Sequence, residues 1–298
     1  MTLAIFPGCL VTYRYPEYEK SAYVILEKLG LKGMFIPEFT CCGSQVLESV
    51  DEKALTALSA RNLAIAQSHG VNTLVALCGS CTFELLRAKK EMEEGERLSE
   101  INEVLGKEGL EYKPDENFNV MHIVEFLTQK GLFEKIGELK RDDIDVRVAI
   151  QEPCNASRPL SLHPGMDCDS FNRKLRGLID ITGASICDFA YERRCCGGTM
   201  LAFDEEVGRR LVALRYAALK ESGADFIINA CPNCQVVYYL YPFVVDKKYR
   251  KKESRLPSAL FFTQLVGLCL GAGLSELGLE RHRDRGIIKE MLENRGGH

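Results

Sequence analysis

Cysteine is the residue type whose placement says most about the chemistry of this chain of 298 residues. Ten of its thirteen cysteines form two copies of one pattern: a single cysteine, then Cys-Cys-Gly, then Cys-x-x-Cys. The first cysteine set is Cys9, Cys41, Cys42, Cys78 and Cys81, and the second cysteine set is Cys154, Cys195, Cys196, Cys231 and Cys234. Thiolates bind soft metals and carry out redox chemistry. Each set has five thiols, one more than a tetrahedral ion or an ordinary cubane cluster uses.

The spacing within the two sets is similar. From the Cys-Cys pair to the Cys-x-x-Cys motif is 36 positions in the first set and 35 in the second. From the single cysteine to the pair is 32 positions in the first set and 41 in the second, so the second set has the longer opening gap. This agreement indicates two repeats of one structural unit, each with its own site.

The composition is that of a soluble globular protein, with 46% apolar and 27% charged residues, and its length suits two domains. The net charge of −4 and the absence of a long basic block argue against nucleic-acid binding. We expect neither a signal peptide nor a transmembrane segment, because the most apolar stretch, 259–274, is short and interrupted, and we interpret it as a buried helix. A cytoplasmic location follows as an expectation, and in a reducing compartment clustered thiols bind metal or do redox chemistry rather than form disulfides.

Hydrophobic periodicity places the cysteines at the ends of strands. Each repeat has the order strand, helix, strand, helix, strand, which is typical of a parallel sheet with helical crossovers. The strands are expected at 3–6, 34–36 and 73–77 and at 146–150, 185–187 and 225–229, and the helices at 16–29, 51–69, 169–181 and 204–222. Because the carboxyl ends of parallel strands share one edge, each cysteine set should converge there. The predicted fold class is α/β, with two homologous repeats that are each a small parallel sheet flanked by helices.

The repeats divide the chain into two predicted domains. The first, 1–144, ends in a helical segment, and the second, 145–298, ends in C-terminal helices. The segments 121–127 and 261–266 are expected to be matching closing helices. A basic loop is expected at 247–255, and a charged surface helix from Glu280 onward.

Three kinds of site could use these thiols. A thioredoxin-like redox pair needs only two sulfurs, which leaves eight of the ten unexplained. A structural zinc ion needs four thiolates, normally from two Cys-x-x-Cys knuckles, whereas each set has one knuckle and an adjacent pair. Adjacent cysteines reach two irons of a larger cluster more easily than they reach one small ion, so the pattern favours iron–sulfur binding. Zinc in at least one set stays open as an alternative.

The chain resembles the B subunit of heterodisulfide reductase, a family built from two cysteine-rich "CCG" domains. The resemblance covers nearly the whole chain and includes both cysteine sets, Pro7-Gly8-Cys9, Arg14-Tyr15-Pro16 and the segment 262–268. The doubled motif is specific for the CCG superfamily. It is less specific for this type of subunit, because CCG domains also occur in subunits linked to glycolate, lactate, glycerol-phosphate and succinate oxidation.

The resemblance implies two non-cubane [4Fe-4S] clusters, one bound by each cysteine set, with all ten cysteines as ligands. It also implies a cytoplasmic enzyme of methanogenesis that reduces the coenzyme M–coenzyme B disulfide, one electron coming from each cluster. The implied partners are a small C subunit with cubane [4Fe-4S] clusters, a flavin-containing A subunit and a hydrogenase or formate dehydrogenase module. The alternative is a CCG-type electron-transfer subunit of a flavin dehydrogenase complex, or a paralogue acting on another disulfide or sulfur compound.

Other residues are candidates because they are near the cysteines in sequence. That disulfide carries sulfonate, carboxylate and phosphate groups, so Arg14, Arg193 and Arg194 are candidates for substrate binding, together with Arg158. His163 is the candidate proton donor for a product thiolate. Cys168, Cys187 and Cys269 lie outside the pattern and are expected to be bystanders.

Overall fold

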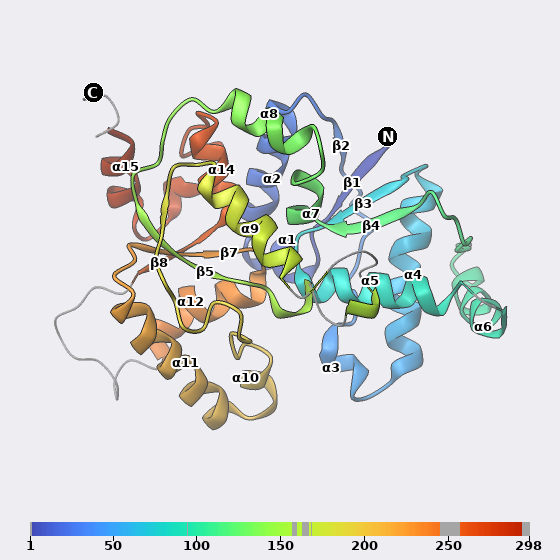
Figure 1. The fold of residues 1–298 in the computed structure, drawn as a ribbon. Coiled ribbons are helices and arrows are strands. Elements are labelled where there is room, and N and C mark those ends of the chain that lie inside the picture. The colour runs from blue at the N-terminus through green and yellow to red at the C-terminus, as the bar shows by residue number, and fades with distance from the viewer. Residues whose placement is uncertain are drawn as a thin grey trace.

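The computed structural model describes residues 2–93, 95–156, 160–162, 167, 169–244 and 257–293. Two four-stranded sheets, parallel throughout, lie at its centre (Figure 1). The first has the order β2 (Gly33–Met34), β1 (Leu3–Phe6), β3 (Thr73–Ala76) and β4 (Asn119–His122). The second has the order β6 (Ser185–Ile186), β5 (Arg147–Gln151), β7 (Phe226–Asn229) and β8 (Ser258–Phe261). The predicted α/β fold of two repeated parallel sheets is confirmed.

Each sheet has a fourth strand that the sequence does not predict. β4 pairs with β3 and β8 with β7, so that Ala76 lies opposite His122 and Asn229 opposite Phe261. The apolar stretch from Ala259 therefore begins as a strand, and its interpretation as a helix is wrong at this end. The closing helices predicted at 121–127 and 261–266 begin later, as α7 (Ile123–Leu127) and α14 (Phe262–Cys269), because β4 and β8 take their first residues. The two helices do match each other in place.

Paired helices cover the sheets in both repeats. α2 (Pro16–Lys28) and α4 (Glu52–Ser68) belong to the first repeat, and α9 (Ser170–Asp180) and α11 (Glu205–Glu221) to the second. The side chains of Asp51 and Asp204 accept the Ala54 and Val207 backbone N–H groups, at 2.9 and 3.0 Å, and so begin α4 and α11 at the predicted positions. The remaining helices are α1 (Cys9–Arg14), α3 (Ser44–Glu48), α5 (Gly79–Glu91), α6 (Gly95–Gly106), α8 (Leu132–Leu139), α10 (Met200–Phe203), α12 (Pro232–Val244) and α15 (Arg285–Glu293). Short 3₁₀ turns lie at Cys154–Ala156, Leu160–Leu162 and Leu279–Arg281.

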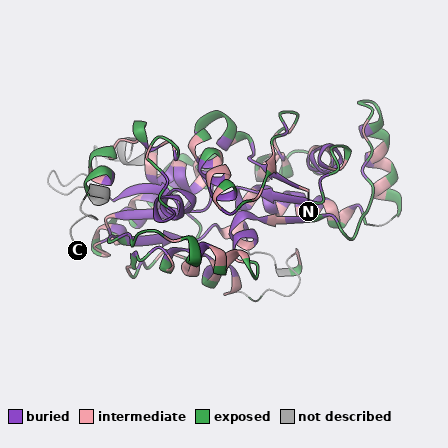
Figure 2. Cartoon of the chain, turned by 90° about the horizontal axis from the view of Figure 1, so that it is seen from above, coloured by how far each residue is buried: buried purple, intermediate pink, exposed green. Residues whose placement is uncertain are grey.

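Helices of each repeat pack against helices of the other repeat. α14 of the second repeat packs on α2 of the first, and α7 of the first packs on α9 of the second. Within the first of these contacts, the Phe261 ring stacks on Tyr18 with centroids 3.9 Å apart, and the Ser21 and Thr263 hydroxyls are 2.6 Å apart. Figure 2 shows the strands of both sheets buried beneath helices whose outer faces are exposed. The proposed units 1–144 and 145–298 are thus joined by two apolar clusters, each with buried residues of both units.

Within the described ranges, no helix is both long enough and apolar enough to cross a membrane. The predicted basic loop at 247–255 lies outside the described residues. The predicted helix after Glu280 is present as α15.

Because Phe261 connects the two repeats, we expect a Phe261→Ala substitution to destabilise both together. Removal of this fully buried ring should lower the free energy of unfolding by about 3–5 kcal/mol. Chemical denaturation followed by fluorescence and circular dichroism should show one shifted transition. Leu214→Ala, at a side chain that is 54% exposed, is the control and should change little. Two separate transitions, only one of them shifted, would contradict a shared core.

Candidate metal centre

The ends of the central strands deliver the cysteines to one edge of each sheet. Cys9 and Cys78 follow β1 and β3, and Cys154 and Cys231 follow β5 and β7. The second thiol of each Cys-x-x-Cys motif lies in the first turn of the helix that follows, α5 or α12. As the sequence predicts, residues more than 30 positions apart meet because parallel strands end on the same side.

The ten sulfurs form one continuous series of contacts. The Sγ atoms of Cys42 and Cys81 are 3.4 Å apart, within the first cysteine set. The Sγ atoms of Cys78 and Cys231 are 3.8 Å apart and connect the first set to the second. Through thiol–thiol interactions the order of the series is Cys9, Cys41, Cys42, Cys81, Cys78, Cys231, Cys234, Cys196, Cys195 and Cys154. The two sets therefore form one site with two halves.

Crowding of the thiols controls their protonation. Hydrogen bonds from Cys42 and Cys9 lower the pKa of Cys41 to about 2, and those from Cys154 and Cys196 lower the pKa of Cys195 to about 2. The pKa values of the thiols that donate these bonds are raised instead. The hydrogen bond to Cys41 and burial raise the pKa of Cys42 to about 12. The hydrogen bond to Cys195 and burial raise the pKa of Cys196 to about 12. Ten adjacent thiolates are incompatible unless cations lie among them. A cluster of soft metal ions fits this donor set.

Glycines at the Cys-Cys turns add backbone donors. The Gly43 N–H lies 3.3 Å from Cys41 Sγ, and the Gly197 N–H lies 3.5 Å from Cys195 Sγ. Both glycines have positive φ, 92° and 89°, a conformation that residues with a Cβ rarely adopt. The glycine of each Cys-Cys-Gly motif thus lets the backbone turn so that its N–H points at the sulfur of the first cysteine of the pair.

The arrangement does not suit a mononuclear zinc site. Among the residues described, no three histidine, cysteine or acidic side chains are grouped as ligands of a single ion. Each cysteine set has five thiols, whereas structural zinc takes four ligands at the corners of a tetrahedron. A cluster with several metal ions can use all five thiols of a set, and one ion cannot.

Two cavities open on this site, of about 210 and 250 Å³. Thiols of the first cysteine set line one of them, and thiols of the second set line the other. Ser80 and Asn233, from the two Cys-x-x-Cys motifs, and Thr199 line both cavities. Over the described part of the chain, no lysine, arginine or histidine lines either cavity.

The predicted cationic residues Arg14, Arg193 and Arg194 do not line these cavities. Arg14 ends α1 with an exposed side chain, and Arg194 is exposed as well. Arg193 pairs with Asp169 at 2.6 Å and with the buried Glu152 at 3.4 Å. Their role in substrate binding stays a prediction. His163, Arg158 and Cys168 lie outside the described residues, while Cys187 is half-buried and Cys269 is buried in the core.

Sequence reasoning missed a buried arginine beside the second cysteine set. Arg215, on α11, is 4% exposed and lies over the Tyr191 ring at 5.0 Å. Its guanidinium donates to the backbone carbonyls of Cys195 and Leu211, the latter at 2.6 Å. In the sequence Arg215 looks like any other arginine of a polar helix, and only alignment of the repeats points to its position.

His122 is a second residue that the sequence did not single out. Its Nδ1 accepts the Val124 backbone N–H at 3.2 Å, so its proton is on Nε2. Nε2 donates to the carbonyl of Ala230, 3.0 Å away and directly before Cys231. A residue of the first repeat thus fixes the backbone that carries a thiol of the second.

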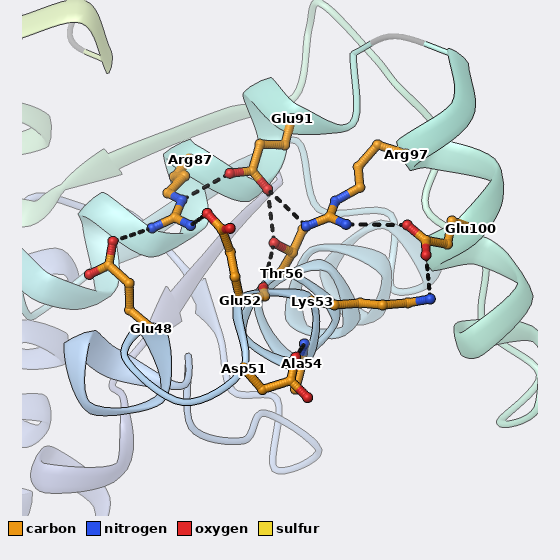
Figure 3. Close-up of polar contacts among 10 residues, drawn as sticks. All are labelled: Glu48, Asp51, Glu52, Lys53, Ala54, Thr56, Arg87, Glu91, Arg97 and Glu100. Atoms are coloured by element: carbon orange, nitrogen blue, oxygen red, sulfur yellow. Dashed lines mark hydrogen bonds and ion pairs between the residues drawn. The ribbon is translucent and has the colours of Figure 1, made fainter.

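Figure 3 shows an ionic network that anchors the helix after Cys41-Cys42. Arg87 of α5 bonds Glu48, Glu52 and Glu91 at 2.7, 2.5 and 2.9 Å. Glu48 ends α3, whose Ser44 and Val46 line the first cavity. The network therefore ties the Cys41-Cys42 loop to the helix that carries Cys81.

Glu84 is a buried acid one turn after Cys81 on α5. It is 1% exposed, and its Oε1 has no hydrogen-bond partner in the described residues. Burial raises the pKa of Glu84 to about 7, the charges of Glu48 and Glu91 add to this, and Arg87 opposes it. The helix that carries Cys81 thus also contains a buried carboxyl group with a raised pKa.

Comparison with known proteins finds the cysteine pattern in one family. The family model described as "CCG: Cysteine-rich domain" matches residues 3–86 and 148–237. The chain is 29% identical, over 96% of its length and 94% of the other's, to the B subunit of the ferredoxin/F420H2-dependent CoB–CoM heterodisulfide reductase of Methanosarcina acetivorans. It is also 29% identical, over 94% of its length and 95% of the other's, to the 8-methylmenaquinol:fumarate reductase membrane anchor subunit of Wolinella succinogenes.

A solved structure has the same fold. The crystal structure of a hypothetical protein from Helicobacter pylori superposes with a TM-score of 0.72 at 23% identity. The match covers 94% of this chain and 51% of that one.

We expect Arg87→Gln to loosen α3, because Glu48, Glu52 and Glu91 lose their shared cation. The free energy of unfolding should fall by about 1–3 kcal/mol, and hydrogen exchange should speed up at 44–48. Arg210→Gln is the matched control, since Arg210 forms one exposed pair with Glu206 on α11. Equal effects of the two substitutions would show that the network does not hold α3.

Glu84 should make stability depend on pH. Its raised pKa means that its contribution to stability is full below about pH 4.5 and is lost as the pH rises through about 7. The free energy of unfolding of Glu84→Gln should therefore be close to that of the wild type at pH 5. At pH 8 it should exceed that of the wild type by about 1–3 kcal/mol. Thermal melts at the two pH values test this, and a gain of equal size at both would count against a buried, titrating Glu84.

Proposed function

The chain belongs to the cysteine-rich CCG family, whose domain it contains twice, and on this premise we propose that it is the disulfide-reducing subunit of a heterodisulfide reductase-type complex. Its relationship to the B subunit of such an enzyme in Methanosarcina acetivorans supports this proposal. The observation that carries it is the contact between the two cysteine sets, with Cys78 and Cys231 sulfurs 3.8 Å apart. One substrate can thus be within reach of both halves.

In this proposal all ten cysteines of the two sets are iron ligands, five for each of two non-cubane [4Fe-4S] clusters. When bound, such clusters supply one-electron redox centres. The mutual contact, burial and shifted pKa values of the thiols fit this role, because a polynuclear cation relieves the repulsion among thiolates. The Gly43 and Gly197 N–H groups would hold Cys41 and Cys195 in their ligating form.

The proposed reaction consumes two electrons and two protons, breaks one S–S bond and yields two thiols. Ser80, Thr199 and Asn233 line both cavities, and these residues would place a disulfide between the two halves. Two one-electron centres, one on each side of the disulfide, would together supply the two electrons that its reduction requires. In the proposal the substrate is the coenzyme M–coenzyme B disulfide, which the Methanosarcina relative is named for.

The proposal requires a separate source of electrons. A small C subunit with cubane clusters and a flavin-containing A subunit fit this need, with a hydrogenase or formate dehydrogenase module behind them. His163 stays the proposed proton donor, and Arg14, Arg193 and Arg194 the proposed contacts for the substrate's anionic ends.

A second candidate function is electron transfer within a dehydrogenase complex, without a disulfide substrate. The Wolinella relative, from a fumarate reductase, matches with the same 29% identity. The lack of a cationic side chain on the described cavity walls also favours a ligand without negative charge. The two functions differ in whether the assembled protein reduces a disulfide.

Loss of either half should abolish disulfide reduction. Cys42→Ser and Cys196→Ser should each reduce turnover at least about 100-fold, because a single one-electron centre cannot complete a two-electron reduction. The assay uses the anaerobically purified complex, a reduced viologen and the coenzyme M–coenzyme B disulfide. Cys187→Ser, outside both sets, is the control and should retain activity.

Half of the wild-type activity in either variant would contradict the two-centre mechanism. A wild-type complex that does not reduce the disulfide but oxidises or reduces a dicarboxylate through its partners would support the second candidate function.

A further inference from the structure

The two halves of the site have equal numbers of sulfurs but differ in the buried charge beside them. Their helices correspond residue by residue. α4 and α11 both have 17 residues and begin after an aspartate cap, Asp51 or Asp204. α5 and α12 both have 13 residues and contain the second thiol of the Cys-x-x-Cys motif.

Asn62 and Arg215 hold the same position in this correspondence and form the same bonds. Each donates to the backbone carbonyl four residues earlier on its helix, Leu58 at 2.9 Å or Leu211 at 2.6 Å. Each also donates to the carbonyl of the first cysteine of its Cys-Cys pair, and for Asn62 this distance is 3.3 Å. The two side chains therefore place the pair in the same way, and they differ by one positive charge.

A second pair of positions differs in the opposite sense. Glu84 is the sixth residue of α5, and the sixth residue of α12 is Val237, which is fully buried. α5 therefore has a buried carboxyl group where α12 has an apolar side chain. The contact of Arg215 with the Cys195 carbonyl makes the surroundings of the second cysteine set the more positive.

Burial makes the charge of Arg215 effective at short range. The guanidinium is packed over Tyr191, and with the side chain 4% exposed, water and salt screen it little. The guanidinium donates to the Cys195 carbonyl, so its charge lies next to the residue that carries one of the thiols. A cation at this position stabilises any added negative charge, including an electron on a metal cluster.

We propose that Arg215 makes the second cysteine set the more easily reduced of the two redox sites, so that the first electron to arrive resides there. This inference rests on the proposed binding of iron–sulfur clusters. A low-potential iron–sulfur or flavin donor supplies that electron, and no bond forms or breaks in the step. Arg215 acts as a positioning residue, which holds the Cys195 backbone and sets the local charge.

The test is a potentiometric titration of the purified complex followed by electron paramagnetic resonance. In the wild type we expect two sites that are reduced at different potentials. In Arg215→Gln the site of higher potential should become at least tenfold harder to reduce, a shift of 59 mV for one electron, while the other site stays unchanged. Arg215→Lys keeps the charge and should retain most of the separation.

Arg209→Gln is the matched control, because Arg209 is on the same helix and pairs with Glu205 at 2.6 Å on the exposed surface. It should shift neither site. The reciprocal substitution Asn62→Lys should make the site of lower potential easier to reduce, and it decides the matter if Arg215→Gln does not assemble.

Equal titrations of Arg215→Gln and Arg209→Gln, in proteins with full iron content, would overturn the inference and leave the proposed function intact. The same holds if Asn62→Lys moves neither site. A wild-type complex without iron and sulfide would instead overturn the proposed function itself.

Discussion

The packing of ten thiols into one continuous series is the constraint on which the rest of the structure depends. Sulfur atoms 3.4 Å apart within the first set and 3.8 Å apart between the sets cannot all be ionised without cations among them. Parallel strands bring these thiols to one edge, and the glycines of the Cys-Cys turns direct backbone N–H groups at the sulfurs. A bound metal cluster would therefore stabilise the fold as well as provide its chemistry.

The contact between the two cysteine sets depends on how the repeats pack. The packing of α2 on α14 and of α7 on α9 fixes one sheet relative to the other. The hydrogen bond from His122 to the Ala230 carbonyl extends this connection to the residue before Cys231. Repetition alone would give two equivalent sites. The replacement of Asn62 by Arg215, and of Glu84 by Val237, makes them unequal in charge while the backbone placement of the cysteines is kept.

Much of this arrangement can be predicted from the sequence, because the strands end directly at cysteines and the caps Asp51 and Asp204 mark where helices begin. β4 and β8 could not be predicted, since each continues into a helix without a glycine or proline between them, and a short apolar strand then looks like the first turn of that helix. Arg193 is near Cys195 in sequence, but it pairs with two acids in the structure. Arg215, twenty residues after Cys195, contacts the Cys195 carbonyl only because the chain folds back on itself.

The central claim is that these thiols hold two polynuclear iron–sulfur clusters in one site. Quantification of iron, zinc and acid-labile sulfide in the anaerobically purified protein, with Mössbauer spectroscopy of the iron, tests it most directly. We expect about eight irons per chain with a similar amount of sulfide. Zinc without sulfide, or iron sufficient for one half of the site only, would contradict the account.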